Sequence, residues 1–276
     1  MRSKPLLGLA ALPLLGYAAM CAWLYARQRN IIYVPSATRI HAGLTDFTLE
    51  RDGVTLRGWV VRAGLPNPVI YFGGNSERIE NRRDQLARLL PGRSIYLLAY
   101  RGFGASGGEP SESALLGDAL ALFDHVREQH PGQPISVIGT SLGTGVASYV
   151  ASKRSVERLV LVAPFDCLVN VAQSHYPLLP MGWIVRDRFD SATHLRGYTG
   201  PVMVLRAGQD DVIPAAHTNR LISVLGRPPH VVDLPFADHS TLGSDPALEG
   251  ALAGFLQADL VRTTEPSVVT GGAHSP

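Results

Sequence analysis

The chain has 276 residues, of which 46% are hydrophobic and 17% are charged, and its net charge is +2. This composition excludes a disordered chain, and without a Lys/Arg cluster we expect no nucleic-acid partner. Two cysteines, Cys21 and Cys167, exclude a disulfide framework and a four-cysteine zinc site. We therefore expect one large domain with small additions.

The first predicted element is an uncharged apolar segment over residues 6–26, close to the ~20 residues that cross a bilayer as a helix. Basic residues flank the segment, and Trp23 and Tyr25 lie near one end, where interfacial aromatic residues are common. We expect residues 1–26 to be a single-pass N-terminal membrane anchor. A cleaved signal peptide and a buried core helix are the alternatives.

The location of the protein follows from the same segment. Balanced basic flanks leave open on which side of the membrane the rest of the chain lies. Nearly all the basic residues are arginines, which is typical of GC-rich bacterial genes. The expected location is therefore a bacterial inner membrane.

After the anchor, short apolar strands alternate with helices. Residues 47–49 and 54–61 alternate about an Asp52-Gly53 turn and predict a hairpin. Unbroken apolar runs predict strands over residues 68–72, 95–100, 135–139, 159–163, 202–205 and 230–234. Helices are expected over 77–90, 112–128, up to about 151, and 246–261. This alternation indicates an α/β fold with a mostly parallel central sheet and helices on both faces.

Two stretches depart from the alternation. Residues 164–200 are expected to form a small helical cap insertion over the site, and residues 263–276, rich in Thr, Ser, Gly and Pro, a disordered tail. The expected organisation is an anchor (1–26), one large α/β domain (27–262) and a tail (263–276).

The most specific motif is Gly139-Thr140-Ser141-Leu142-Gly143, which fits G-x-S-x-G between a strand and a helix. Such a tight turn projects the Ser141 hydroxyl above the sheet, and only small residues fit on either side. A serine is a weak nucleophile, so it needs a histidine base and an acid that orients the base. The alternative is an ordinary glycine-rich turn.

The acid and the base should follow later strands. Asp210 and Asp211 follow the strand over 202–205, and we favour Asp210 as the acid, with Asp166 as a minor candidate. His239 lies in the loop after the last strand and is the expected base. The chain order Ser141, Asp210, His239 is that of serine hydrolases with this alternation.

An oxyanion hole needs two backbone N–H donors near the nucleophile. One should be Leu142, at a helix N-terminus whose dipole helps. The other should be Asn75, in the Gly73-Gly74-Asn75-Ser76 loop after the first parallel strand. The alternative is that the glycines make a turn and Ser76 caps a helix, and both interpretations can hold together.

Residues 102–107 fit G-x-G-x-x-G, a dinucleotide-binding pattern. Earlier strands precede this motif, and the nearest acids, Asp118 and Asp124, lie inside a predicted helix. We therefore expect a structural loop and no cofactor. No spacing typical of a metal site occurs, so we expect no metal.

These motifs together resemble the α/β-hydrolase superfamily and its membrane-anchored Bem46-like or ABHD12/13/17-like branch. The matching stretches are residues 27–35, 100–112, 139–143, 187–191 and 210–214. The resemblance implies an α/β-hydrolase fold and a serine hydrolase acting on esters, thioesters or amides, and it supports Asp210 over Asp211. Gly73 stands where the branch usually has histidine, and Thr144 where it usually has glycine, so substrate specificity is not carried over.

Two functions remain as hypotheses. The first is a membrane-anchored serine hydrolase with a small or lipid-like acyl substrate. The second is a non-catalytic binding or scaffold protein of the same fold, which a broken triad would favour; here the triad is complete in type and order.

Overall fold

The computed structural model describes residues 5–257 and centres on an eight-stranded sheet with the order β1-β2-β4-β3-β5-β6-β7-β8. The pairs β1–β2 and β2–β4 are antiparallel, and every other pair is parallel. The predicted mostly parallel sheet is confirmed. The strands are β1 (Phe47–Arg51), β2 (Val54–Val61), β3 (Val69–Phe72), β4 (Ile95–Leu98), β5 (Ser136–Thr140), β6 (Leu159–Val162), β7 (Val202–Ala207) and β8 (His230–Leu234).

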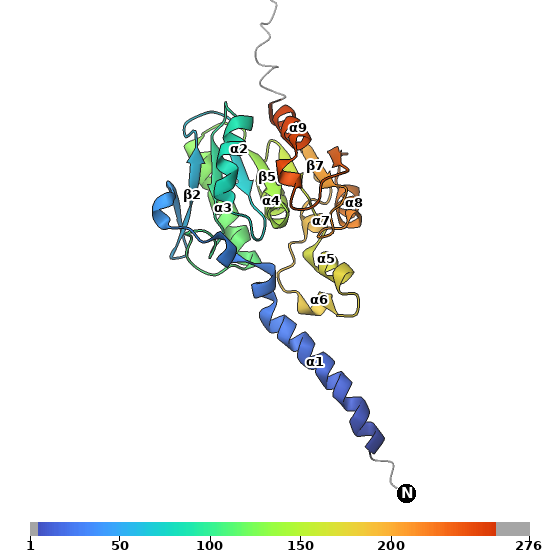
Figure 1. Ribbon diagram of the computed structural model, residues 1–276. Helices are drawn as coiled ribbons and strands as arrows, with labels where there is room; N and C mark the ends of the chain where they lie inside the picture. The colour runs from blue at the N-terminus through green and yellow to red at the C-terminus, as the bar shows by residue number, and fades with distance from the viewer. Residues whose placement is uncertain (1–4, 258–276) are drawn as a thin grey trace, which may run out of the picture.

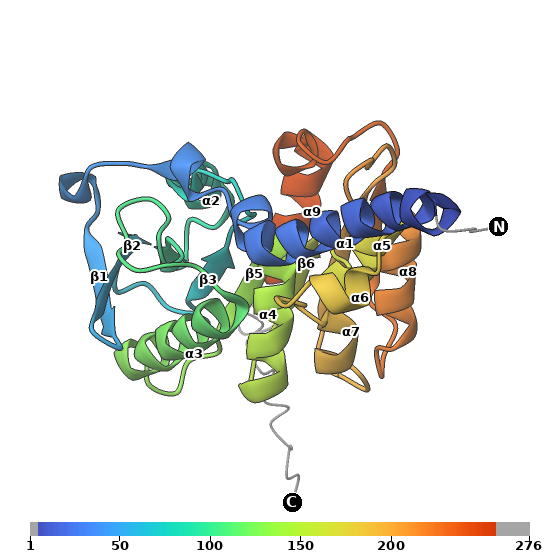
Figure 2. The same ribbon diagram turned by 90° about the horizontal axis from the view of Figure 1, so that it is seen from below.

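Helices cover both faces of the sheet, as expected for strands that are apolar throughout (Figure 1). On one face α3, α4, α7 and α8 lie side by side, and α2 contacts α9 on the other (Figure 2). These helices are α2 (Arg82–Leu89), α3 (Glu112–Gln129), α4 (Leu142–Lys153), α7 (Ser191–His194), α8 (Ala215–Ser223) and α9 (Pro246–Gln257).

The core lies on the central strands. Every residue of β3, β4 and β6 is buried. Burial of a large aliphatic side chain stabilises a fold by ~1.5–3 kcal/mol, so these strands hold the sheet in place beneath the site. The Asp52-Gly53 turn of the predicted hairpin has positive φ at both residues (51° and 71°), as a type I′ turn requires.

The cap insertion is helical, as predicted. Between β6 and β7 it contains α5 (Leu168–His175), α6 (Met181–Ile184) and α7. The predicted helix over residues 77–90 is wrong at its start: a 3-10 turn, η3 (Ile79–Asn81), comes first and α2 begins at Arg82. The reason is Glu77. Its carboxylate accepts hydrogen bonds from Gly74 N–H and from the Arg82 guanidinium, and these bonds hold the residues before α2 in a turn.

The N-terminal segment forms a long helix, α1 (Pro5–Ile32), which extends away from the domain and contacts α6 (Figure 1). Short 3-10 turns, η1 (Pro35–Thr38) and η2 (Ala42–Leu44), lead from it to β1. Within residues 5–257 no helix is both long enough and apolar enough to cross a membrane. The predicted transmembrane helix is thus a helix, but it is not confirmed as a membrane span. The predicted tail and the end of the last predicted helix lie outside the described residues.

Candidate active site

Ser141 lies on a strained turn between β5 and α4, with φ 51° and ψ −119°. A non-glycine residue at positive φ costs ~1–3 kcal/mol, and such strain is common at functional sites. Neighbouring glycines allow the turn: a Cβ on Gly139 would clash with Gly143 O, and one on Gly143 would clash with Phe72 O. The sequence therefore folds here only with small residues on both sides of the serine.

The residues predicted as nucleophile, base and acid lie in one hydrogen-bonded row. Ser141 Oγ is 3.0 Å from His239 Nε2, and His239 Nδ1 is 2.8 Å from Asp210 Oδ2. The other carboxylate oxygen of Asp210 accepts the backbone N–H groups of Val212 (3.0 Å) and Ile213 (2.7 Å). Both oxygens of Asp210 are thus fixed, so it can orient the imidazole and stabilise its charge.

The loop that carries His239 is organised by its neighbour Asp238. One oxygen of this partly exposed carboxylate accepts hydrogen bonds from the hydroxyl and backbone N–H groups of Ser240 and Thr241. These bonds, that of the Ser240 hydroxyl first, lower the pKa of Asp238 to about 2. The carboxylate therefore stays charged and keeps the turn closed behind His239.

Asn75 and Leu142, the predicted oxyanion donors, both line the cavity that Ser141 and His239 also line. Leu142 is the first residue of α4, so its N–H has no acceptor within the helix and lies at the positive end of the helix dipole. The Asn75 loop approaches the nucleophile closely, because a Cβ on Gly74 would lie 3.5 Å from Ser141 Cβ.

Asn75 is held in place by the end of α1 and by Val34, the residue before η1. Its side-chain amide donates to Ile32 O (3.1 Å), and its carbonyl accepts from Val34 N (3.2 Å). The N-terminal helix is therefore connected directly to the loop beside Ser141. Sequence reasoning, which treated residues 1–26 as an anchor, gave no sign of this connection.

Glu77, which no motif predicted as a site residue, supports the same loop through Gly74. Its carboxylate accepts the Gly74 N–H (2.8 Å) and the Tyr71 hydroxyl (2.8 Å), and it pairs with Arg82. Burial, and next the charge of Glu77, raise the pKa of Tyr71, so this phenol stays protonated and donates. The only sequence signal was an acidic residue that follows the glycines.

The cavity above Ser141 has a volume of about 410 Å³ and mostly apolar walls. Phe165 and Leu168 of the cap segment line one side, and Ile31 and Ile32 of α1 line another. An apolar cavity with a few convergent polar groups is typical of a small-molecule site. The cavity can therefore hold the apolar part of a small molecule while the molecule's reacting atom lies beside Ser141 Oγ.

A second serine–histidine–aspartate set lies between the cap segment and α8. His217 Nδ1 is 2.8 Å from Asp166 Oδ1, and His217 Nε2 is 3.1 Å from Ser174 Oγ. Asp166, the minor candidate for the acid, thus contacts His217 and not His239. Its other oxygen accepts from Arg220 (2.6 Å) and Asn170 (2.7 Å).

This second set joins elements and does not line the cavity of Ser141. Ser174 is in the last turn of α5, and its hydroxyl donates to Val171 O (2.8 Å) within that helix. Burial raises the pKa of Asp166. The hydrogen bonds from Arg220, Asn170 and His217 outweigh this and hold that pKa below its ordinary value. The charged carboxylate therefore ties α5 of the cap to α8.

The chain is similar to several known proteins. The profile of the family described as "Serine aminopeptidase, S33" matches residues 72–181. An uncharacterized protein of Mycobacterium tuberculosis is 32% identical over 94% of this chain and 97% of its own length. "Lysophosphatidylserine lipase ABHD12" of Danio rerio is 30% identical over 69% of this chain, which spans 58% of that protein.

The chain belongs to the α/β-hydrolase superfamily, in its ABHD-like branch. Solved structures share its fold. Est1E from Butyrivibrio proteoclasticus has a TM-score of 0.64 at 15% identity and covers 79% of this chain and 99% of its own. The enol-lactonase from Burkholderia xenovorans LB400 has a TM-score of 0.60 at 15% identity, over 76% of this chain and 100% of its own. The predicted α/β-hydrolase fold is confirmed.

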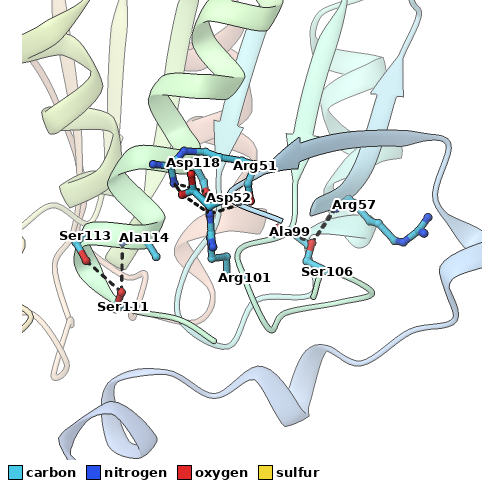
Figure 3. A network of polar contacts seen from close by, with 10 residues as sticks. All are labelled: Arg51, Asp52, Arg57, Ala99, Arg101, Ser106, Ser111, Ser113, Ala114 and Asp118. Atoms are coloured by element: carbon cyan, nitrogen blue, oxygen red, sulfur yellow. Dashed lines mark hydrogen bonds and ion pairs between the residues drawn. The ribbon is translucent and has the colours of Figure 1, made fainter. Parts of the chain in front are cut away.

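The glycine-rich motif over residues 102–107 forms a loop beside a buried group of ion pairs. Asp118 of α3 accepts Arg101 Nε (2.7 Å) and also pairs with Arg51 (2.9 Å), as Figure 3 shows. Ser106 Oγ donates to Ala99 O (2.8 Å) and accepts from Arg57 N (2.9 Å).

The backbone of this loop is also engaged. The N–H groups of Gly102, Gly104 and Gly107 donate to Gly107 O, Thr38 Oγ1 and Thr55 O, at 2.9–3.0 Å. These N–H groups are therefore not available to a phosphate, which a dinucleotide site would require. Within residues 5–257 no group of three or more His, Cys, Asp or Glu is placed to hold a metal ion.

Proposed function

We propose that this α/β-hydrolase is a serine hydrolase that cleaves carboxylic ester or thioester bonds, with amide bonds as a further option, through an acyl-enzyme. One observation carries the proposal: Ser141, on its strained turn, is hydrogen-bonded to His239, which is hydrogen-bonded to Asp210. One relative is named a lipase, and the matching family is described as a serine aminopeptidase. Both names refer to enzymes that cleave an acyl bond, which supports the same chemistry.

Acylation begins when His239 Nε2 takes the proton of Ser141 as Oγ attacks the carbonyl carbon. Asp210 keeps the imidazole in the tautomer that has its free lone pair at Nε2, and it stabilises the imidazolium that forms. His239 then gives this proton to the leaving oxygen or sulfur. The C–O or C–S bond breaks and the acyl group remains on Ser141.

The negative charge that develops on the carbonyl oxygen needs donors already in place. We assign this role to the backbone N–H groups of Leu142 and Asn75. Glu77 acts as a positioning residue, because it holds the Gly74 N–H and with it the Asn75 loop. Water, deprotonated by His239, cleaves the acyl-enzyme by the reverse sequence of proton transfers.

We also propose that α1 associates with a membrane. From Leu12 onward it exposes many large apolar side chains, and the neighbouring cap exposes Leu178 (86%) and Trp183 (87%). Tyr17 of α1 donates to Leu178 O (2.8 Å), so the two apolar surfaces are adjacent. Such a combined patch favours an apolar environment over water. After cell lysis and ultracentrifugation, the protein should be found in the membrane fraction; recovery entirely in the soluble fraction would contradict this.

The test of the proposed function is hydrolysis of p-nitrophenyl butyrate by the full-length protein in detergent. We expect turnover by the wild type and by Ser174→Ala, and none above background by Ser141→Ala. Ser174 is the matched control because it also contacts a histidine that contacts an aspartate. No turnover by the folded wild type, on this ester or on the matching thioester and anilide, would instead indicate a non-catalytic binding or scaffold protein.

A further inference from the structure

A second cavity, of about 150 Å³, lies between α1 and the cap. Leu24 of α1 lines one side, and Leu179, Met181 and Ile184 of the cap line the other. Figure 2 shows α1 crossing the same end of the sheet as α5 and α6. No charged side chain of the described residues lines this cavity. Its walls therefore suit an apolar group that has no hydrogen bonds to satisfy.

The second cavity adjoins the catalytic cavity. Ile31, Ile32, Ala172 and Val185 line both cavities, whereas Ser141 lines only the catalytic one. A flexible chain whose reacting end lies at Ser141 can therefore continue between α1 and the cap.

Polar contacts hold α1 against the cap, so this wall of the cavity is fixed. The buried Gln28 donates to Ile184 O (2.8 Å) and accepts from Arg186 N (2.5 Å). The next residue of α1, Arg29, pairs with Asp187 (3.0 Å). Each contact joins α1 to the segment that lines the opposite side of the cavity.

The position of the cavity indicates which part of a substrate it holds. The leaving group must lie near His239, which gives it a proton, and His239 does not line the second cavity. The acyl chain begins at the carbonyl carbon beside the Asn75 loop. That loop is hydrogen-bonded to Ile32, where the two cavities meet.

We propose that the second cavity binds the distal part of the substrate's acyl chain, so that α1 is one wall of the acyl site. The proposal rests on the serine hydrolase function proposed above. It assigns the substrate class as esters or thioesters of unbranched carboxylic acids long enough to reach beyond Ile32. Leu24 is then a residue that determines chain-length selectivity, although it lies in the segment predicted to be only an anchor.

The test compares kcat/KM for p-nitrophenyl laurate with kcat/KM for p-nitrophenyl butyrate, using full-length protein in detergent. Leu24→Trp fills the second cavity from α1 and leaves the catalytic cavity unchanged. Each methylene excluded from an apolar site costs about fourfold, so the laurate/butyrate ratio should fall about tenfold or more. Butyrate hydrolysis should stay within about twofold of the wild type, because its chain ends before the second cavity.

Leu15→Trp is the matched control, because it makes the same change on α1 at a position that is 65% exposed. It should leave the ratio unchanged. A second variant, Ala172→Phe, narrows the junction of the two cavities and should also lower the ratio. Its control is Ala216→Phe on the exposed side of α8.

The proposed acyl site is overturned if Leu24→Trp and Ala172→Phe both hydrolyse butyrate and keep the wild-type ratio, or if Leu15→Trp lowers it equally. Either result leaves the serine hydrolase proposal standing. If the folded wild-type protein hydrolyses neither ester, nor the matching thioester and anilide, the proposed function fails and the acyl site fails with it.

Discussion

Two serine–histidine–aspartate sets occur in this fold, one at Ser141 and the other at Ser174, and the distances within them are nearly alike. The serine–histidine distances are 3.0 and 3.1 Å, and both histidine–aspartate distances are 2.8 Å. Their surroundings differ. Ser141 has a positive φ at the N-terminus of α4 and lines a cavity. Ser174 lies in the last turn of α5, and its hydroxyl donates to the backbone of its own helix.

This difference shows that residue types and distances do not by themselves define a catalytic triad. A nucleophile also needs free space for a substrate and N–H donors for the oxyanion. Ser141 lines a cavity together with the proposed donors Leu142 and Asn75, whereas Ser174 does not line it. Ser174 donates its proton to Val171 O, so its oxygen accepts from His217, and this set satisfies buried polar groups and joins two helices.

The largest expected effect is that of Ser141→Ala. Removal of the nucleophile of a triad costs about 10⁴-fold or more in kcat, and the folded protein should otherwise be unchanged. Steady-state hydrolysis of p-nitrophenyl butyrate measures this. Residual activity within about tenfold of the wild type would place the nucleophile elsewhere.

Asp210→Asn should rank second. An amide at this position leaves the geometry intact but favours the wrong imidazole tautomer, which costs about 10³–10⁴-fold in kcat. The matched control is Asp211→Asn, because Asp211 is an exposed neighbour, and it should change kcat less than about twofold. Equal losses in the two variants would contradict the assignment of the acid.

Glu77→Ala should have an intermediate effect. The Gly74 N–H loses its acceptor and the Asn75 loop loses its support, so kcat should fall about 10–100-fold. KM should hardly change, because the oxyanion donors act in the transition state. Glu77→Gln keeps an acceptor and should recover part of the loss. A change in KM alone would indicate a merely structural role.

Asp166→Asn should affect stability and not chemistry. It removes a charge that three donors share, and should lower the free energy of unfolding by ~1–3 kcal/mol at pH 7 with kcat nearly unchanged. Since the pKa of Asp166 is lowered on folding, its contribution is present above about pH 4 and is lost as the pH falls through the folded-state value. Urea unfolding should therefore show a smaller difference between wild type and variant in acid. A difference that grows in acid would contradict this.

The members of the proposed triad could be brought together from the sequence because each follows the end of a strand, and parallel strands bring those ends to one edge. Asp166 obeys the same rule, yet it contacts His217. That outcome depends on how α5 packs against α8, which no local pattern encodes. The contact between Gln28 and Ile184 joins residues 156 positions apart, so the part that α1 plays in the cavity could not be read from its composition.

The smallest expected effect is that of Ser174→Ala. Its hydroxyl is one of several partners in the network, so stability should fall by less than ~1 kcal/mol and turnover should stay at the wild-type level. Thermal unfolding and ester hydrolysis measure the two quantities. A loss of activity comparable to that of Ser141→Ala would reverse the assignment of the two sets.

The most direct test of the central claim is to label the full-length protein with an alkyl fluorophosphonate and map the adduct by peptide mass spectrometry. An active serine displaces fluoride and keeps the phosphonyl group on Oγ. The adduct should be on Ser141 and absent from Ser174, and Asp210→Asn should slow its formation while Asp166→Asn does not. An adduct on Ser174, or none on the folded wild type, would contradict the account.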